Sequence, residues 1–186
     1  STRLASVDFL LLAGIAFFLM SLMSSSTASL ADPAIPAPGS VEDLARDAAS
    51  SAEIPAWLLL STGQVESGLR HLSPRGSGEG RTFYPYGIQR NRGRDIFGRF
   101  YGRPPDDQDE LDAALGDLEI NTQFAAAELA RGVERYGLDP DRLRLFWVWP
   151  AAARSGPPYA EQYGSVPTAR RLANWHAAID QWQAVA

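Results

Sequence analysis

Glu66 is the residue whose setting in the sequence most clearly predicts chemistry. It follows a mostly apolar stretch, residues 54–65, and precedes Ser67 and Gly68, so it lies in the last turn of a predicted helix. Burial disfavours the charged form of a carboxyl group, and an apolar helix end can therefore keep this group protonated near neutral pH. Such a group can donate a proton to a reacting oxygen. The alternative interpretation is a solvated surface glutamate.

Three further segments carry polar and aromatic side chains in a defined order. They are Tyr86-Gly87-Ile88-Gln89, the segment that begins with Asn121-Thr122-Gln123, and Pro157-Pro158-Tyr159-Ala160-Glu161-Gln162-Tyr163. Together with Glu66-Ser67, they resemble the soluble lytic transglycosylase family, whose members are related to goose-type lysozyme. That family has a Glu-Ser pair at a helix end, a Gly-x-x-Gln-like turn, a helix that opens with Asn, and a Pro-Pro-Tyr-x-Glu loop. The resemblance covers about residues 54–163.

The resemblance implies a mainly α, lysozyme-like single domain and an enzyme that cuts bacterial peptidoglycan without a cofactor. Most glycosidases place two carboxyl groups across the scissile bond. The family uses one, which Glu66 matches. It protonates the oxygen of the β-1,4 bond between MurNAc and GlcNAc, and then, as a carboxylate, removes the proton of the muramoyl 6-hydroxyl. That hydroxyl attacks its own C1, so the product is 1,6-anhydroMurNAc.

The resemblance also assigns substrate contacts near Glu66. Ser67 matches a serine that hydrogen-bonds the substrate, although a serine at a helix end also bonds readily to backbone. Gly87 and Gln89 match the turn that lines the floor of the cleft. For Tyr86 two interpretations stay open, stacking on a sugar ring and packing within the fold.

The segment from residue 146 to residue 163 both matches and departs from the family. Tyr159 and Tyr163 lie where the family places a tyrosine against its catalytic glutamate, and Tyr163 follows the Pro-Pro-Tyr-x-Glu element as that tyrosine does. Many relatives carry Ala-Tyr-Asn-x-Gly before this loop. Here Pro150 takes the place of the Asn, and proline offers neither a side-chain amide nor a backbone donor. Trp147 and Trp149 are candidates for an apolar sugar-binding surface or for core packing.

Residues 70–103 are basic in a protein whose net charge is −5. Glu79 and Asp95 oppose eight arginines, which are Arg70, Arg75, Arg81, Arg90, Arg92, Arg94, Arg99 and Arg103. These side chains can attract the carboxylates of peptidoglycan stem peptides, or be solvated loop residues. Nucleic-acid binding is a competing use of such a segment, and the acidic charge of the whole chain argues against it.

A helical scaffold is expected to position these residues. The predicted helices cover residues 40–50, 55–67, 109–136 (one helix or two in tandem), 139–149 and 172–182. Ser40 and Asp43 form a capping pattern, Gly68 permits a turn, and Pro150 should kink or end its helix. Residues 70–105 predict loops and at most short helices. Because no run alternates like a strand, the expected class is mainly α.

The N-terminal part predicts a membrane anchor. Residues 9–31 carry no charge over 23 positions, enough for a helix to cross a bilayer. A signal-peptidase site before Asp32 is the alternative, and we expect an uncleaved anchor in residues 1–31. Arg3 favours a cytoplasmic N-terminus, which places the rest in the periplasm or at a phage virion membrane. The Pro-rich residues 32–39 predict a linker, and residues 40–186 the lysozyme-like domain.

Composition narrows the remaining options. The chain has no cysteine, and its two histidines, His71 and His176, are far apart, so we expect no disulfide and no structural metal. The predicted function is a lytic transglycosylase that opens the wall locally for a phage virion or for a secretion or conjugation machine. The alternatives are a hydrolytic muramidase of the same fold and a non-catalytic, peptidoglycan-binding assembly protein.

Overall fold

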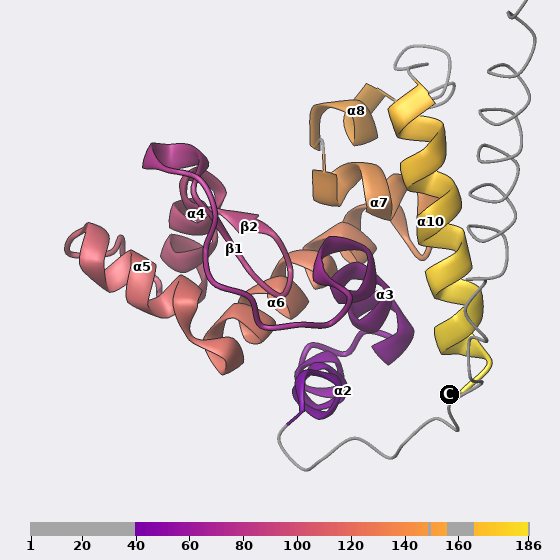
Figure 1. The fold of residues 1–186 in the computed structure, drawn as a ribbon, viewed down its shortest axis with the longest axis horizontal. Helices are drawn as coiled ribbons and strands as arrows, with labels where there is room; N and C mark the ends of the chain where they lie inside the picture. Colours follow the sequence, from indigo (N-terminus) through magenta and orange to yellow (C-terminus); the bar gives the residue numbers. More distant parts are fainter. Residues whose placement is uncertain (1–39, 149, 156–165, 186) are drawn as a thin grey trace, which may run out of the picture. The chain divides into compact units, whose positions relative to one another are not determined.

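Helices dominate the computed structural model of the chain, which describes residues 40–148, 150–155 and 166–185. The helices are α2 (Val41–Ser51), α3 (Ala56–Ser67), α4 (Arg90–Tyr101), α5 (Gln108–Gly116), α6 (Leu118–Tyr136), α7 (Pro140–Val148), α8 (Pro150–Ser155) and α10 (Val166–Gln183). A short 3-10 helix, η1 (Gly78–Gly80), and two strands, β1 (Thr82–Phe83) and β2 (Ile88–Gln89), precede α4 (Figure 1). The predicted mainly α class is therefore confirmed.

Local capping signals set several helix ends where the sequence predicts them. The Ser40 hydroxyl accepts a hydrogen bond of 3.2 Å from the Asp43 amide at the start of α2. Gly68 ends α3 with a left-handed φ of 67°. The long apolar series after residue 108 forms two helices, because Asp117 interrupts it in an extended conformation. The Asp117 carboxylate then caps α6 by accepting from the Ile120 amide at 2.9 Å.

The segment from residue 70 to residue 105 is more ordered than the sequence predicts. Strands β1 and β2 pair antiparallel, with Thr82 opposite Gln89 and Phe83 opposite Ile88. Each strand is two residues long, so an alternating pattern cannot appear in the sequence. The expectation of loops and at most short helices is also wrong for α4, which is 12 residues long.

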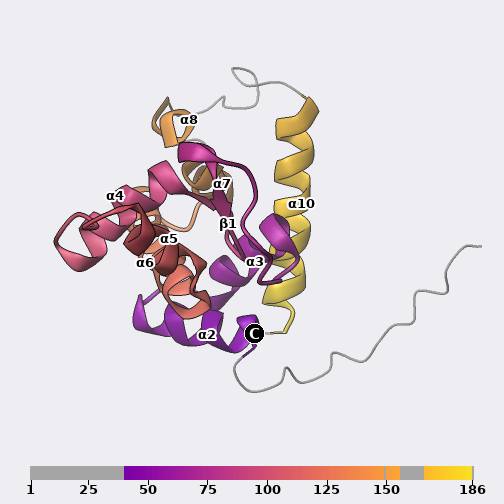
Figure 2. The ribbon, with the colours of Figure 1, turned by 60° about the vertical axis from the view of Figure 1, so that its left-hand side comes forward.

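Helix α3 lies at the centre of the packing. Leu58, Leu59 and Leu60 are consecutive and each is at most 1% exposed, which is expected only of a helix covered on all sides. It contacts α2, α6 and α10. Figures 1 and 2 both show α10 alongside α3 and α7. The last turn of α3 thus carries Glu66 from the core toward the surface.

No described helix is both long and apolar enough to cross a membrane. The predicted anchor at residues 9–31 and the linker at residues 32–39 lie outside the described residues. Three predicted side chains, Trp149, Tyr159 and Tyr163, also lie outside them.

Candidate functional site

Glu66 is partly accessible at the end of α3, with 22% of its side chain exposed. Its Oε1 atom accepts a hydrogen bond of 2.8 Å from Nη1 of Arg144. Because charge-assisted hydrogen bonds are among the stronger ones in proteins, this contact fixes one oxygen of the carboxyl group.

Arg144 reaches Glu66 from α7 and is a residue that the sequence does not single out. Its side chain is 5% exposed. The guanidinium carbon lies 5.7 Å from the centre of the Trp175 ring on α10. Trp175 is buried too, and its Nε1 donates a hydrogen bond of 2.9 Å to the carbonyl oxygen of Pro140. The ion pair therefore joins α3, α7 and α10 at one point.

The turn between β1 and β2 packs against the second oxygen of Glu66. Gly87 has a φ of 70°, in the left-handed region that favours glycine. A Cβ atom built there would lie 2.7 Å from Oε2 of Glu66, so only glycine lets the backbone approach so closely. Gln89 follows at the end of β2 with an exposed side chain. Glu66, Gly87 and Gln89, which are predicted to share a cleft, thus come together.

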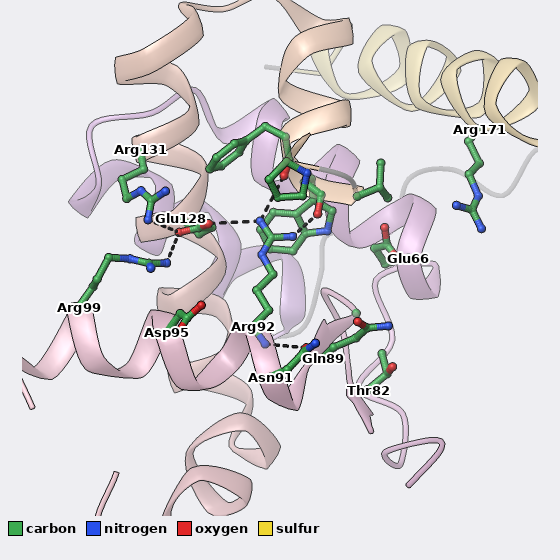
Figure 3. A pocket seen from close by; sticks show the side chains of 15 residues that line it. Glu66, Thr82, Gln89, Asn91, Arg92, Asp95, Arg99, Glu128, Arg131 and Arg171 are labelled. Carbon is green, nitrogen blue, oxygen red and sulfur yellow. Dashed lines mark hydrogen bonds and ion pairs between the residues drawn. The ribbon is translucent and has the colours of Figure 1, made fainter. Parts of the chain in front are cut away.

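A cavity of about 690 Å³ opens in front of these residues (Figure 3). Its lining includes Glu66, Gly87, Gln89, Arg92, Asp95, Arg99, Glu128, Arg131, Trp147 and Pro150. A smaller cavity of about 230 Å³ lies on the Arg144 side and is also bordered by Glu66. Glu66 therefore borders two cavities.

Ser67 and Tyr86 do not line the main cavity. The Ser67 hydroxyl donates to the carbonyl oxygen of Gly63 at 3.2 Å and accepts from the Arg70 amide at 3.0 Å. It thus makes the backbone contacts that were the alternative to substrate binding. Tyr86 is fully buried, and burial raises the pKa of its phenol. The structure therefore favours packing for Tyr86, and the predicted sugar contact is incompatible with this burial.

Trp147 lines the cavity, but 4% of the residue is exposed and the side chain belongs to the hydrophobic core. The Arg92 guanidinium covers its ring at 4.5 Å and donates a hydrogen bond to its carbonyl oxygen. Core packing is thus the better interpretation of Trp147. Pro150, which takes the place of an Asn in the family that the sequence resembles, is exposed and lines the same cavity.

Glu128 is a second cavity carboxylate that sequence analysis missed. Only 6% of its side chain is exposed, and three arginines surround it, Arg92 at 3.4 Å, Arg99 at 2.7 Å and Arg131 at 3.5 Å. In Figure 3, Glu128, Arg99 and Arg131 lie on the opposite side of the view from Glu66, and Arg92 lies between them. A signal for it existed in α6, where Glu128 lies one turn after Phe124 and next to Leu129, both of which are buried.

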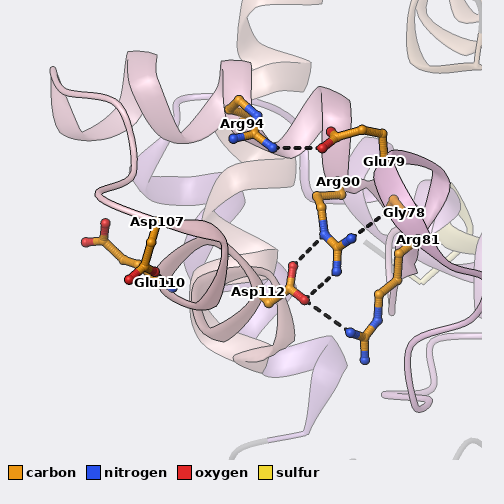
Figure 4. A network of polar contacts seen from close by, with 8 residues as sticks. All are labelled: Gly78, Glu79, Arg81, Arg90, Arg94, Asp107, Glu110 and Asp112. Atoms are coloured by element: carbon orange, nitrogen blue, oxygen red, sulfur yellow. Dashed lines mark hydrogen bonds and ion pairs between the residues drawn. The ribbon is translucent and has the colours of Figure 1, made fainter.

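Most of the eight arginines in the basic segment serve the fold. Several form ion pairs away from the cavity: Arg81 and Arg90 with Asp112, and Arg94 with Glu79 (Figure 4). Arg103 pairs with Glu110 and Asp106. Arg90 is the buried member, and it also donates to the carbonyl oxygen of Gly78 at 2.6 Å. Of the eight, Arg92 and Arg99 line the cavity. The alternative of a solvated loop arginine is wrong for Arg90, which is buried, whereas Arg81, Arg94 and Arg103 are paired but remain partly exposed.

The site can perform acid–base chemistry through one group. Glu128 is enclosed by three guanidinium groups, whereas Glu66 has one and keeps an exposed edge. In the described part of the chain, His, Asp and Glu side chains form no group of three that could hold a metal ion.

No protein-family model matches the chain, and neither a curated protein nor a solved structure does. Its function is therefore inferred from the geometry of this site.

Proposed function

We propose that the chain is a peptidoglycan lytic transglycosylase with Glu66 as its single catalytic carboxyl group. The observation that carries the proposal is the meeting of Glu66 with Gly87 and Gln89 at one cavity. These residues come from separate motifs that the family resemblance assigns to one cleft. The cavity volume, about 690 Å³, also lies within the range of roughly 300–1,000 Å³ that ligand pockets occupy.

In the proposed reaction Glu66 acts twice. As an acid it gives its proton to the oxygen between MurNAc and GlcNAc, and the bond from that oxygen to C1 breaks. As a carboxylate it then takes the proton of the muramoyl 6-hydroxyl, whose oxygen forms the new bond to C1. The products are a GlcNAc-terminated strand and a 1,6-anhydroMurNAc end, and Glu66 regains its proton.

Arg144 supports the second half of this cycle because it holds and neutralises the carboxylate that Glu66 becomes. The acid step in turn requires Glu66 to carry a proton when the glycan covers the site and displaces water. Gly87 limits the movement of the other oxygen. The proposal thus assigns Arg144 and Gly87 to positioning.

The setting that we propose is local wall opening by a phage virion or by an envelope-spanning secretion or conjugation machine. It depends on residues 9–31 acting as an uncleaved anchor with the lysozyme-like domain on the periplasmic side. The support is the uncharged run of 23 residues, which is followed by a Pro-rich linker.

Zymography and product analysis test the proposal on the full chain. The parent should clear peptidoglycan and Glu66→Gln should not, because an amide cannot donate the proton. Mass spectrometry of the digest should find anhydro ends. Reducing ends without anhydro ends would instead identify the hydrolytic muramidase of the same fold.

A non-catalytic, peptidoglycan-binding role is the second candidate, and Pro150 is the observation that favours it. This exposed residue lines the cavity and lacks the amide that many members of the family carry there. If the folded parent and Glu66→Gln bind sacculi equally and neither clears them, this second candidate replaces the first.

A further inference from the structure

Three arginines from two helices surround one buried carboxylate in the wall of the main cavity. Arg92 and Arg99 come from α4, and Arg131 comes from α6, as does Glu128 itself. All four line the cavity, and we call them the arginine cluster. Figure 3 shows Arg99 and Arg131 converging on Glu128.

The cluster has hydrogen-bond donors that Glu128 does not use. A guanidinium group carries five N–H donors, whereas a carboxylate has two oxygens. Arg99 and Arg131 both approach Oε2 of Glu128, through a single nitrogen each. Their side chains are 42% and 41% exposed, so the remaining donors of both face accessible space.

The cluster also keeps an excess of positive charge. Asp95, an exposed residue of α4, is the other acid at this end of the cavity. Three guanidinium groups therefore face two carboxylates. Burial is the main cause that lowers the pKa of Arg92. The charge of Glu128 raises this pKa, and the nearby charges of Arg99 and Arg131 lower it further. A further anion would relieve this repulsion among like charges.

We infer that Arg99 and Arg131 form a subsite for a carboxylate of the glycan substrate, at the end of the cavity away from Glu66. This inference rests on the proposed function for the identity of the substrate. The planar guanidinium fork matches a carboxylate with two parallel hydrogen bonds, and Glu128 holds both forks in place. Peptidoglycan supplies carboxylates from its stem peptides, and from the lactyl groups of muramic acid once the peptides are removed.

Binding without cleavage tests this subsite. The full chain carrying Glu66→Gln is sedimented with intact sacculi, and with sacculi whose carboxyl groups have been converted to neutral amides. Adding Arg99→Ala should weaken binding to intact sacculi by about fivefold, in line with a partly exposed ion pair. The Glu66→Gln chain should bind amidated sacculi as weakly as the chain with both substitutions binds intact sacculi. On amidated sacculi, adding Arg99→Ala should cause no further loss.

Arg94→Ala is the matched control for Arg99→Ala. Arg94 lies on the same helix, is 44% exposed and also pairs with one glutamate, but it does not line the cavity. It should leave binding unchanged. Asp95→Asn should strengthen binding by about twofold, because it removes a competing charge without removing a donor. Equal losses for Arg94→Ala and Arg99→Ala, or no effect of amidation, would overturn the subsite.

Strands freed of their peptides by an amidase identify the source of the carboxylate. Arg99-dependent binding that persists assigns the lactyl group, and binding that disappears assigns the stem peptide; either result supports the subsite. Failure of the two proposals is distinguishable. A parent chain that does not cut, but whose binding depends on Arg99 and carboxylates, refutes only the transglycosylase. A parent chain that cuts, but whose binding depends on neither Arg99 nor carboxylates, refutes only the subsite.

Discussion

Replacing Gly87 by alanine tests whether the turn between β1 and β2 positions Glu66. The new methyl group would lie 2.7 Å from Oε2 of Glu66, roughly 0.7 Å closer than ordinary contact. The carboxyl group cannot retreat freely, because Arg144 holds its other oxygen at 2.8 Å. We therefore expect Glu66 to move by a few tenths of an ångström or more, or its hydrogen bond to Arg144 to break.

Gly102→Ala provides the control for the backbone cost of this change. Gly102 has a φ of 69°, against 70° for Gly87, and a Cβ atom there would meet nothing within 4 Å. Each variant should lose about 1–2 kcal/mol of unfolding free energy, the cost of a left-handed conformation with a side chain. A difference between the two variants then reports the contact with Glu66 alone.

The assay compares cleavage of sacculi per folded molecule, with thermal unfolding as the measure of the folded fraction. A misplacement of about 1 Å can lower a rate on the order of 100-fold, so Gly87→Ala should cut roughly 10- to 100-fold more slowly than Gly102→Ala. Similar rates for the two variants would refute the reasoning. They would mean that the turn does not hold Glu66, or that Glu66 does not carry out the reaction.

Three other substitutions test separate contacts. Arg144→Met should lower the unfolding free energy by about 1–3 kcal/mol because it leaves Glu66 without its partner; urea unfolding of a double-mutant cycle with Glu66→Gln should show coupling, and strict additivity would argue against the ion pair. Tyr86→Phe should flatten the loss of stability above about pH 10, the ordinary pKa of tyrosine. Burial raises the pKa of Tyr86 in the folded state. Its contribution to the unfolding free energy is therefore complete below the unfolded pKa and is lost as the pH rises toward the folded pKa. Equal pH dependence of the unfolding free energy in parent and variant, measured by urea titration, would contradict this. Asp112→Asn should lower the thermal midpoint and leave cleavage per folded molecule unchanged, since Arg90 uses Asp112 to join α4 and α5 away from the cavity; a loss of cleavage at full folding would be unexpected.

Elements with local end signals could be predicted from the sequence. Ser40 caps α2, and Asp139 accepts a hydrogen bond of 3.1 Å from the Arg142 amide at the start of α7. In α10 the spacing of Trp175, Ile179 and Trp182 marks a buried face. In each case the pattern involves residues of one helix or its cap, so it can be recognised in the sequence without knowledge of the rest of the fold.

Helix α4 could not be predicted because its stability comes from tertiary contacts. Its sequence contains Gly93 and Gly98, which lower the intrinsic helix preference. Ile96 and Phe97 are nevertheless buried, and a Cβ atom at Gly93 would lie 2.6 Å from a Leu115 methyl group. The glycine that weakens the local helix signal is thus the one that allows α4 to pack closely on α5.

Some residues of the candidate site could be predicted from the sequence, and others could not. The sequence predicts Gly87 and Gln89 beside Glu66 because the order of these residues along the chain resembles that of a known family. Arg144 and Glu128 follow no such order. Arg144 lies 78 residues from Glu66, and the arginines around Glu128 come mainly from another helix. Only the folded structure shows which carboxylate a given arginine neutralises.

The number of arginines around each cavity carboxylate assigns the two glutamates different roles. Glu128, with three guanidinium groups and 6% exposure, has little access to a glycosidic oxygen. Glu66 has one guanidinium group and 22% exposure, so a substrate can reach it and change its surroundings. A group that transfers protons must have surroundings that the substrate can change, whereas a carboxylate that only supports the fold needs all of its hydrogen-bonding capacity filled. The positive charge that Glu128 leaves uncompensated is then available to orient the substrate whose glycosidic oxygen Glu66 is proposed to protonate.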